Sequence, residues 1–174
     1  MKTRSSRTVY ENRWISVRED VVERADGSTG IYGVVEKRHF AVVIPLDGDG
    51  VWLVEQFRYP LGGRFWEFPQ GTWDGEPEGD AAALARAELS EEAGLAAGSL
   101  RHLSFLYQAP GLATLGFDVF LATELERVEP RRSVEEQDMR AARFPVAEFE
   151  RMARSGAIRD TPTIAAWGLL MLER

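Results

Sequence analysis

The sequence predicts a mixed α/β domain, and three observations carry that prediction. Short apolar stretches separated by Asp-Gly turns fill the first third of the chain. An alanine-rich helical stretch follows, and further strand-like stretches then lead into two final helical stretches. Strands before, between and after helices are typical of a mixed α/β domain. The length of 174 residues favours one domain.

The first third of the chain is expected to form a meander of hairpins. Its predicted strands cover residues 14–22, 30–36, 40–46 and 51–57. Residues 40–46 are nearly all apolar, which predicts a buried strand. The sequence Asp47-Gly48-Asp49-Gly50 invites comparison with a calcium loop. It lacks the third acidic position and the closing glutamate of an EF-hand, so a turn is favoured.

Residues 80–93 predict a helix that begins at an N-cap, Asp80, and stops at Gly94. Its predicted apolar stripe is Ala82, Ala85, Leu89 and Ala93. Beyond this helix, strands are expected over residues 103–108, 117–122 and 141–144. The last two helices are expected over residues 145–154 and 161–172.

Three carboxylates crowd the end of the alanine-rich helix. Glu88, Glu91 and Glu92 stand at i, i+3 and i+4, so they are expected on one helix face beside the apolar stripe. Like charges at these spacings destabilise an isolated helix by roughly 0.2–0.5 kcal/mol per pair. Two explanations remain open: a solvated acidic face, or a face that binds a metal ion.

Composition excludes several classes of function. A net charge of −7 argues against a large nucleic-acid-binding surface. The absence of cysteine excludes disulfides, thiolate zinc sites and a cysteine nucleophile. The basic N-terminus is followed by no apolar region, and no apolar run approaches 18 residues. We therefore expect a cytoplasmic protein without membrane association.

Several motifs resemble those of the Nudix hydrolase family. Residues 88–95, Glu-Leu-Ser-Glu-Glu-Ala-Gly-Leu, match the last eight positions of the Nudix signature. Three further stretches resemble motifs of its ADP-ribose pyrophosphatase-like members: residues 55–60, residues 66–71, and residues 155–160 with Thr163. The resemblance implies a Nudix-type α/β/α sandwich with a mixed β-sheet. It divides the chain into an N-terminal β-rich extension, residues 1–38, for dimerisation and substrate contacts, and a Nudix domain, residues 39–174.

The same resemblance implies an activity. It is Mg²⁺-dependent hydrolysis of the diphosphate of a nucleoside diphosphate sugar by a metal-activated water, with Mn²⁺ as a possible substitute. ADP-ribose is the favoured substrate, giving AMP and ribose 5-phosphate. The alternatives are another nucleoside diphosphate derivative and a nucleotide-sensing module without catalysis. A homodimer is also implied.

Site residues follow from the resemblance position by position. Glu88 and Glu92 are the implied metal ligands, Glu91 shares a further ion or takes part in catalysis, and the backbone carbonyl of Gln70 is an extra ligand. The turn at Gly71 would let the backbone approach the metal.

The implied general base is a glutamate on the loop 133–138, with Glu136 preferred over Glu135. Arg58 would bind a phosphate or form a surface ion pair. Trp14 would stack on the nucleobase of the substrate or pack in a hydrophobic core.

The signature is incomplete upstream of Glu88. Where it calls for arginine, glutamate and glycine, this chain has Ala87, Gly79 and Trp73. Gly71 lies two residues earlier than the signature glycine, so the loop 72–79 is lengthened by two residues.

Glu78 and Arg86 are eight positions apart, as the signature's glutamate and arginine are. One hypothesis is that this pair has shifted by one residue and ties the loop to the helix; the alternative is that Arg86 is a solvated cation.

Overall fold

The computed structural model describes residues 1–73, 79–132 and 137–173. Two compact units divide the chain: residues 1–39 with 107–116, and residues 40–106 with 117–174. The division into an N-terminal extension of residues 1–38 and a Nudix domain of residues 39–174 stays a prediction. The segment 107–116 groups with the N-terminal unit although it is far away in sequence.

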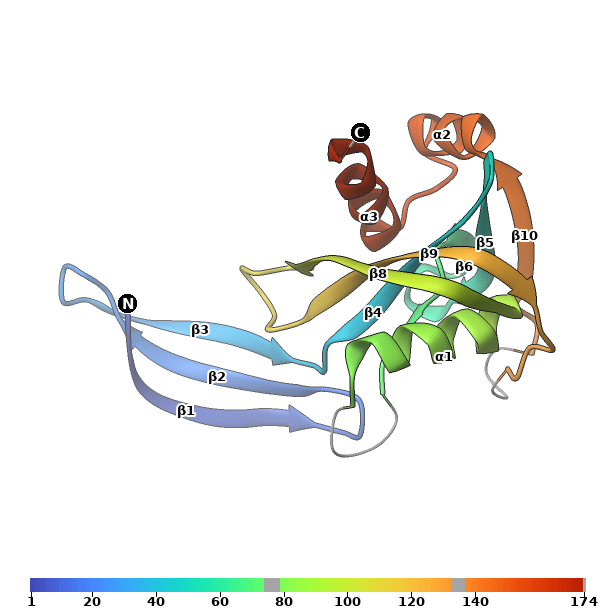
Figure 1. The fold of residues 1–174 in the computed structure, drawn as a ribbon. Coiled ribbons are helices and arrows are strands. Elements are labelled where there is room, and N and C mark those ends of the chain that lie inside the picture. Colours follow the sequence, from blue (N-terminus) through green and yellow to red (C-terminus); the bar gives the residue numbers. More distant parts are fainter. Residues whose placement is uncertain (74–78, 133–136, 174) are drawn as a thin grey trace. The chain divides into compact units, whose positions relative to one another are not determined.

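The N-terminal unit contains an antiparallel three-stranded sheet in the order β1-β2-β3 (Figure 1). The strands are β1 (Lys2–Glu11), β2 (Ser16–Glu23) and β3 (Thr29–Glu36). Opposite charges face each other across β1 and β2, where Arg4 pairs with Glu23 and Arg7 with Glu19. Sequence analysis did not predict β1, because its polar side chains carry no apolar alternation.

The turn between β2 and β3 forms where Asp26-Gly27 predicted it. Gly27 has a positive φ of 82°, a conformation that favours glycine. The Asp26 carboxylate accepts a hydrogen bond from the Ser28 backbone N–H at 3.0 Å. The local chemistry of the turn therefore defines this hairpin.

The segment 107–116 is hydrogen-bonded to β3. The Val35 N–H donates to the Leu112 carbonyl at 2.9 Å, and the Thr114 N–H donates to the Val35 carbonyl at 3.0 Å. At its end, the Gly116 N–H donates to Nδ1 of His39 at 3.0 Å. Two backbone bonds and one bond to a histidine side chain thus tie the segment to the N-terminal unit.

The second unit is built on a mixed sheet with the strand order β10-β5-β4-β9-β8. The strand β4 (Phe40–Asp47) runs parallel to β9 (Gly116–Arg127) and antiparallel to β5 (Gly50–Arg58). The flanking strands are β10 (Arg140–Pro145) and β8 (Leu95–Tyr107). Two shorter strands, β6 (Gly63–Glu67) and β7 (Gln70–Gly71), pair with β5 and β4, and a short 3-10 helix, η1 (Tyr59–Leu61), precedes β6.

Helices cover both faces of this sheet (Figure 1). The side chains of β4 alternate between the two layers: Val42 and Ile44 join the cluster with α2 (Val146–Ser155) and α3 (Thr161–Leu172), whereas Ala41 and Val43 join the cluster with α1 (Ala81–Ala93). The all-apolar sequence of β4 follows from this double coverage. The predicted α/β/α sandwich with a mixed sheet is confirmed.

The ends of α1 lie where sequence analysis placed them. The Asp80 carboxylate accepts a hydrogen bond from the Ala82 N–H at 3.2 Å, and Gly94 adopts the left-handed conformation with φ 65°. The turn Asp47–Gly50 joins β4 to β5, as expected, and Arg143 pairs with Asp49. Across residues 1–73, 79–132 and 137–173, no helix is long and apolar enough to cross a membrane.

Candidate active site

The centre of the candidate site is the turn between β6 and β7, with the sequence Glu67-Phe68-Pro69-Gln70-Gly71. Its backbone is fixed on the sheet, because the Val43 N–H donates to the Pro69 carbonyl at 2.9 Å and Gln70 pairs with Val42 of β4. We call residues 67–71 the β6–β7 turn. The helix α1 contacts β7, so the acidic end of the helix and the turn come together.

Two glutamates of α1, one helical turn apart, touch this turn. The Gln70 N–H donates to Oε2 of Glu92 at 2.9 Å, and the Glu92 side chain is buried. The carboxylate of Glu88 lies against the Cα of Gly71, where a Cβ would collide with it. Any residue other than glycine at position 71 would therefore push Glu88 away.

Glu91 lies on the exposed surface of α1, whereas Glu88 is half-buried and Glu92 is buried. The three carboxylates that the sequence placed on one face thus differ in environment. The reason is geometric: positions 88 and 92 are stacked at i and i+4, while position 91 is rotated by about 100° from position 92.

Arg58 of β5 pairs with Glu67 at the start of the turn. The guanidinium Nε lies 2.9 Å from Oε1 and 3.1 Å from Oε2 of Glu67. Burial raises the pKa of the Glu67 carboxyl, and the Arg58 guanidinium opposes part of that rise. Burial would lower the pKa of Arg58, but the hydrogen bonds and charge of Glu67, with the charges of Asp160 and Glu92, raise it above its usual range. Arg58 therefore stays charged and brings a positive charge to the acidic site.

A second set of bonds links the turn to the start of α3. The Gln70 side-chain amide donates to Glu67 at 2.9 Å and to Asp160 at 3.1 Å. The Phe68 N–H donates to the Thr163 hydroxyl at 2.9 Å. The sequence motif that contains Asp160 and Thr163 carried no predicted role, and no role was predicted for Glu67.

The residues at the turn fit a hard divalent cation. Two carboxylates one helical turn apart face a close-approaching backbone, and oxygen donors are what Mg²⁺ and Mn²⁺ prefer. Within residues 1–73, 79–132 and 137–173, no three Asp, Glu or His side chains are grouped as metal ligands. Glu88 and Glu92 are the two carboxylates of α1 that touch the β6–β7 turn, and they could hold such a cation.

Both ends of the loop that carries the candidate bases are anchored. Arg132 donates to the Glu92 carbonyl at 3.0 Å and also to the Met139 carbonyl. Arg64 binds the Asp138 carboxylate at 2.5 Å and Glu55 at 3.0 Å. The candidate bases themselves, Glu135 and Glu136, lie outside the described residues.

The remaining predicted positions lie elsewhere. Trp14 belongs to the N-terminal unit, is exposed, and carries the Arg13 guanidinium 4.0 Å from its ring centroid. Arg86 donates to the Ala97 carbonyl of β8 at 2.6 Å. Its hypothetical partner Glu78 lies outside the described residues, so that pairing stays a prediction.

The departures from the signature at positions 73 and 79 are coupled in space. The indole of Trp73 packs against the core around α1 and lies directly over the Cα of Gly79, where a Cβ would collide with the ring. Trp73 and Gly79 thus meet across the lengthened loop. A large residue at one position requires glycine at the other.

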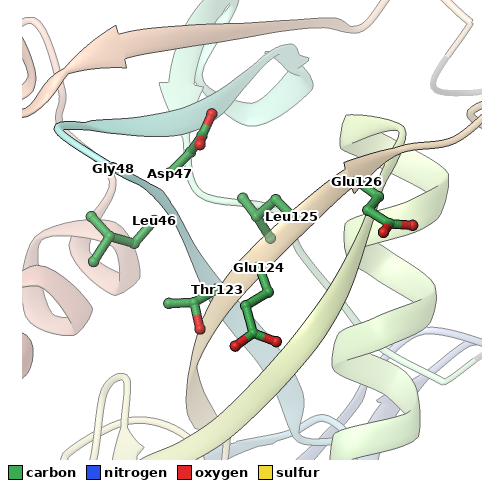
Figure 2. Close-up of a pocket in the computed structure, with 7 residues that line it drawn as sticks. All are labelled: Leu46, Asp47, Gly48, Thr123, Glu124, Leu125 and Glu126. Atoms are coloured by element: carbon green, nitrogen blue, oxygen red, sulfur yellow. The ribbon is translucent and has the colours of Figure 1, made fainter.

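A shallow cavity of about 670 Å³ lies away from these residues, where β4 ends beside β9. Figure 2 shows Leu46 and Asp47 on one side and Thr123 to Glu126 on the other. None of its lining residues belongs to the β6–β7 turn or to α1.

Comparison with known proteins agrees with this fold. The family described as "NUDIX domain" matches residues 36–166, and the family described as "Nucleoside diphosphate sugar hydrolase N-terminal domain" matches residues 1–35. The chain therefore belongs to the Nudix family of hydrolases, and its recognition from sequence is confirmed.

Several known proteins resemble this chain along most of its length. An ADP-ribose pyrophosphatase of Bacillus subtilis (strain 168) is 27% identical over 174 residues, which cover 99% of this chain and 93% of that protein. A GDP-mannose pyrophosphatase of Citrobacter koseri is 29% identical over 156 residues, covering 84% and 74%. A crystal structure described as an ADP compounds hydrolase shares the fold with a TM-score of 0.87 at 21% identity, covering 98% of this chain and 91% of that chain.

Proposed function

We propose that the protein hydrolyses the diphosphate of a nucleoside diphosphate sugar in a reaction that depends on Mg²⁺ or Mn²⁺. ADP-ribose is the favoured substrate, and its products are AMP and ribose 5-phosphate. The observation that carries the proposal is the contact of Glu88 and Glu92 with the β6–β7 turn. The relatives that match along most of the chain include pyrophosphatases of ADP-ribose and GDP-mannose.

The chemistry divides among residues of this chain. Glu88, Glu92 and the main chain of the turn would hold the cation, with Glu91 as a further candidate. When bound, the cation would neutralise diphosphate charge and activate a water. Glu136, or Glu135, would accept the proton of that water as its oxygen forms a bond to phosphorus. The bond from that phosphorus to the bridging oxygen would break, and the second phosphate would leave with that oxygen.

Arg58 is a weaker candidate for phosphate binding than its sequence motif suggests. Its guanidinium is bonded to both carboxylate oxygens of Glu67. A phosphate would have to share this cation with a buried carboxylate. We therefore propose that Arg58 supports the turn, and we leave the stacking role of Trp14 as a separate proposal.

A panel of nucleoside diphosphate sugars tests the proposal. Purified protein is incubated with ADP-ribose, GDP-mannose, UDP-glucose or a dinucleotide in Mg²⁺, and the products are separated by chromatography. We expect a nucleoside monophosphate and a sugar phosphate, with ADP-ribose cleaved fastest. Excess EDTA should abolish the reaction, and full activity in EDTA would contradict the metal site.

The rival function, a sensor that binds nucleotide without hydrolysis, gives a different result in the same experiment. It would show saturable nucleotide binding by calorimetry and no products with any member of the panel. The presence of Glu88 and Glu92 at the turn favours the hydrolase.

A further inference from the structure

The motif of residues 155–160 with Thr163 contributes none of the proposed metal ligands. It forms the junction between the last two helices. Gly156 ends α2 in the left-handed conformation, with φ 75°. Asp160 is the N-cap of α3 and accepts hydrogen bonds from the Thr163 N–H at 2.8 Å and the Thr163 hydroxyl at 2.7 Å. A helix cap alone would need no more than these bonds.

Asp160 makes one bond that capping does not require. Its Oδ2 also accepts a hydrogen bond from the side-chain amide of Gln70 at 3.1 Å. The second bond of that amide goes to Glu67 at 2.9 Å. Because both hydrogens of the amide have a carboxylate partner, the buried Gln70 side chain is held in one orientation.

The backbone of the same residue faces the metal-binding helix. The Gln70 N–H donates to Glu92, and two residues earlier the Phe68 N–H donates to Thr163, whose side chain is fully buried. The β6–β7 turn is thus held between α1 on one side and the first turn of α3 on the other. A shift of α3 would be passed on to the residue that carries the Glu92 contact.

We propose that Asp160 and Thr163 are positioning residues for the metal site. They act through Gln70 and Phe68 to fix the β6–β7 turn at the distance from Glu88 and Glu92 at which a cation binds. This inference rests on the proposed metal-dependent function and adds a role for residues that touch neither the cation nor the substrate.

The test measures metal binding without turnover. Mn²⁺ is titrated into the full-length protein without substrate, and free Mn²⁺ is followed by electron paramagnetic resonance. Gln70→Met keeps the side-chain size and the backbone but removes the amide link, and Thr163→Val removes the hydroxyl at nearly constant volume. Arg159→Ala is the matched control, because the side chain of this exposed neighbour donates to the Gly156 carbonyl of its own turn at 2.7 Å and not to the β6–β7 turn.

We expect Gln70→Met and Thr163→Val each to weaken Mn²⁺ binding about 10-fold, the loss typical when a residue that supports metal ligands is removed. Arg159→Ala should bind as the wild type does. The half-saturating Mg²⁺ concentration for hydrolysis should rise in parallel, with a smaller change in the KM for substrate. The double variant should lose less than the product of the two single effects, because both changes release the same turn.

Two results would overturn the proposal in distinguishable ways. If both variants have lower melting temperatures but bind Mn²⁺ as the wild type does, the contacts only stabilise the fold and the inference fails alone. If the wild-type protein binds no Mn²⁺, the proposed metal site fails as well. Should Thr163→Val not fold, Gln70→Met and the milder Asp160→Asn decide between these results.

Discussion

Glu92 combines burial, a negative charge and a backbone hydrogen bond in one side chain. It is 2% exposed, it accepts a hydrogen bond from the Gln70 N–H, and its charge acts on the nearby Arg58 guanidinium. The proposed cation would add a further positive charge beside this carboxylate. The same cation would offset the repulsion expected between Glu88 and Glu92 on α1.

Glu92→Gln should lower kcat at least about 100-fold and weaken Mn²⁺ binding, since the amide keeps the shape and the acceptor for Gln70 but loses the charge. The melting temperature should be unchanged or higher, because repulsion along the helix is relieved. Steady-state kinetics and calorimetry measure both effects. Glu126→Gln, in the cavity of Figure 2, is the control, and normal activity is expected there.

The Trp73 ring leaves no room for a side chain at Gly79. Gly79→Ala would place a Cβ against the Trp73 ring and should destabilise the fold by about 1–3 kcal/mol, the usual cost of overpacking. Urea denaturation measures the change. Gly111→Ala is the control because no atom of the described residues lies within 4 Å of its added Cβ, and an equal effect in both variants would contradict the packing argument.

At the scale of elements, sequence patterns predicted most of the second unit because local chemistry decides it. Asp80 caps the start of α1 and Gly94 caps its end. The apolar run of β4 matches a strand that is covered on both faces. The polar strand β1 and the two-residue strand β7 were missed. The polar side chains of β1 carry no apolar alternation, and the position of β7 depends on Val42 of β4, which is far away in sequence.

The candidate site could be predicted only where the signature is intact. Glu88 and Glu92 were singled out by the resemblance to the Nudix signature, and both lie at the β6–β7 turn. The supporting residues Glu67, Asp160 and Arg132 could not be assigned, because their contacts span up to 90 residues of sequence and no periodicity encodes them.

The loop between Arg132 and Asp138 yields a prediction about the general base. Glu136→Gln should lower kcat about 100-fold or more with little change in KM, because a base acts in the transition state. Glu135→Gln is the matched control and should retain most activity. A loss confined to Glu135→Gln would move the assignment by one residue, and full activity in both variants would place the base elsewhere.

At the scale of the whole molecule, the sheet of the N-terminal unit has little core of its own. All of β1 is exposed in the single chain, and so are large apolar side chains such as Val9, Tyr10 and Ile31. A small sheet needs a covered apolar face to be stable. We therefore propose that this unit pairs with a second copy of the chain, as sequence analysis expected.

Light scattering at micromolar concentration should give about twice the chain mass of 19.5 kDa. Tyr10→Asp should shift the mass toward that of the monomer, because it places a charge on the exposed apolar surface. Leu172→Asp, at another exposed apolar side chain in α3, should leave the mass unchanged. A wild-type monomer would exclude the proposed dimer.

The bond between Gln70 and Asp160 also sets an order of events during synthesis. The ribosome makes the chain from its N-terminus, so Gln70, Glu88 and Glu92 emerge well before Asp160 and Thr163. Until the first turn of α3 has emerged, the Gln70 amide lacks one acceptor and the Phe68 N–H lacks its hydroxyl partner. The nascent protein thus completes the support of the β6–β7 turn only when its last helix begins to form.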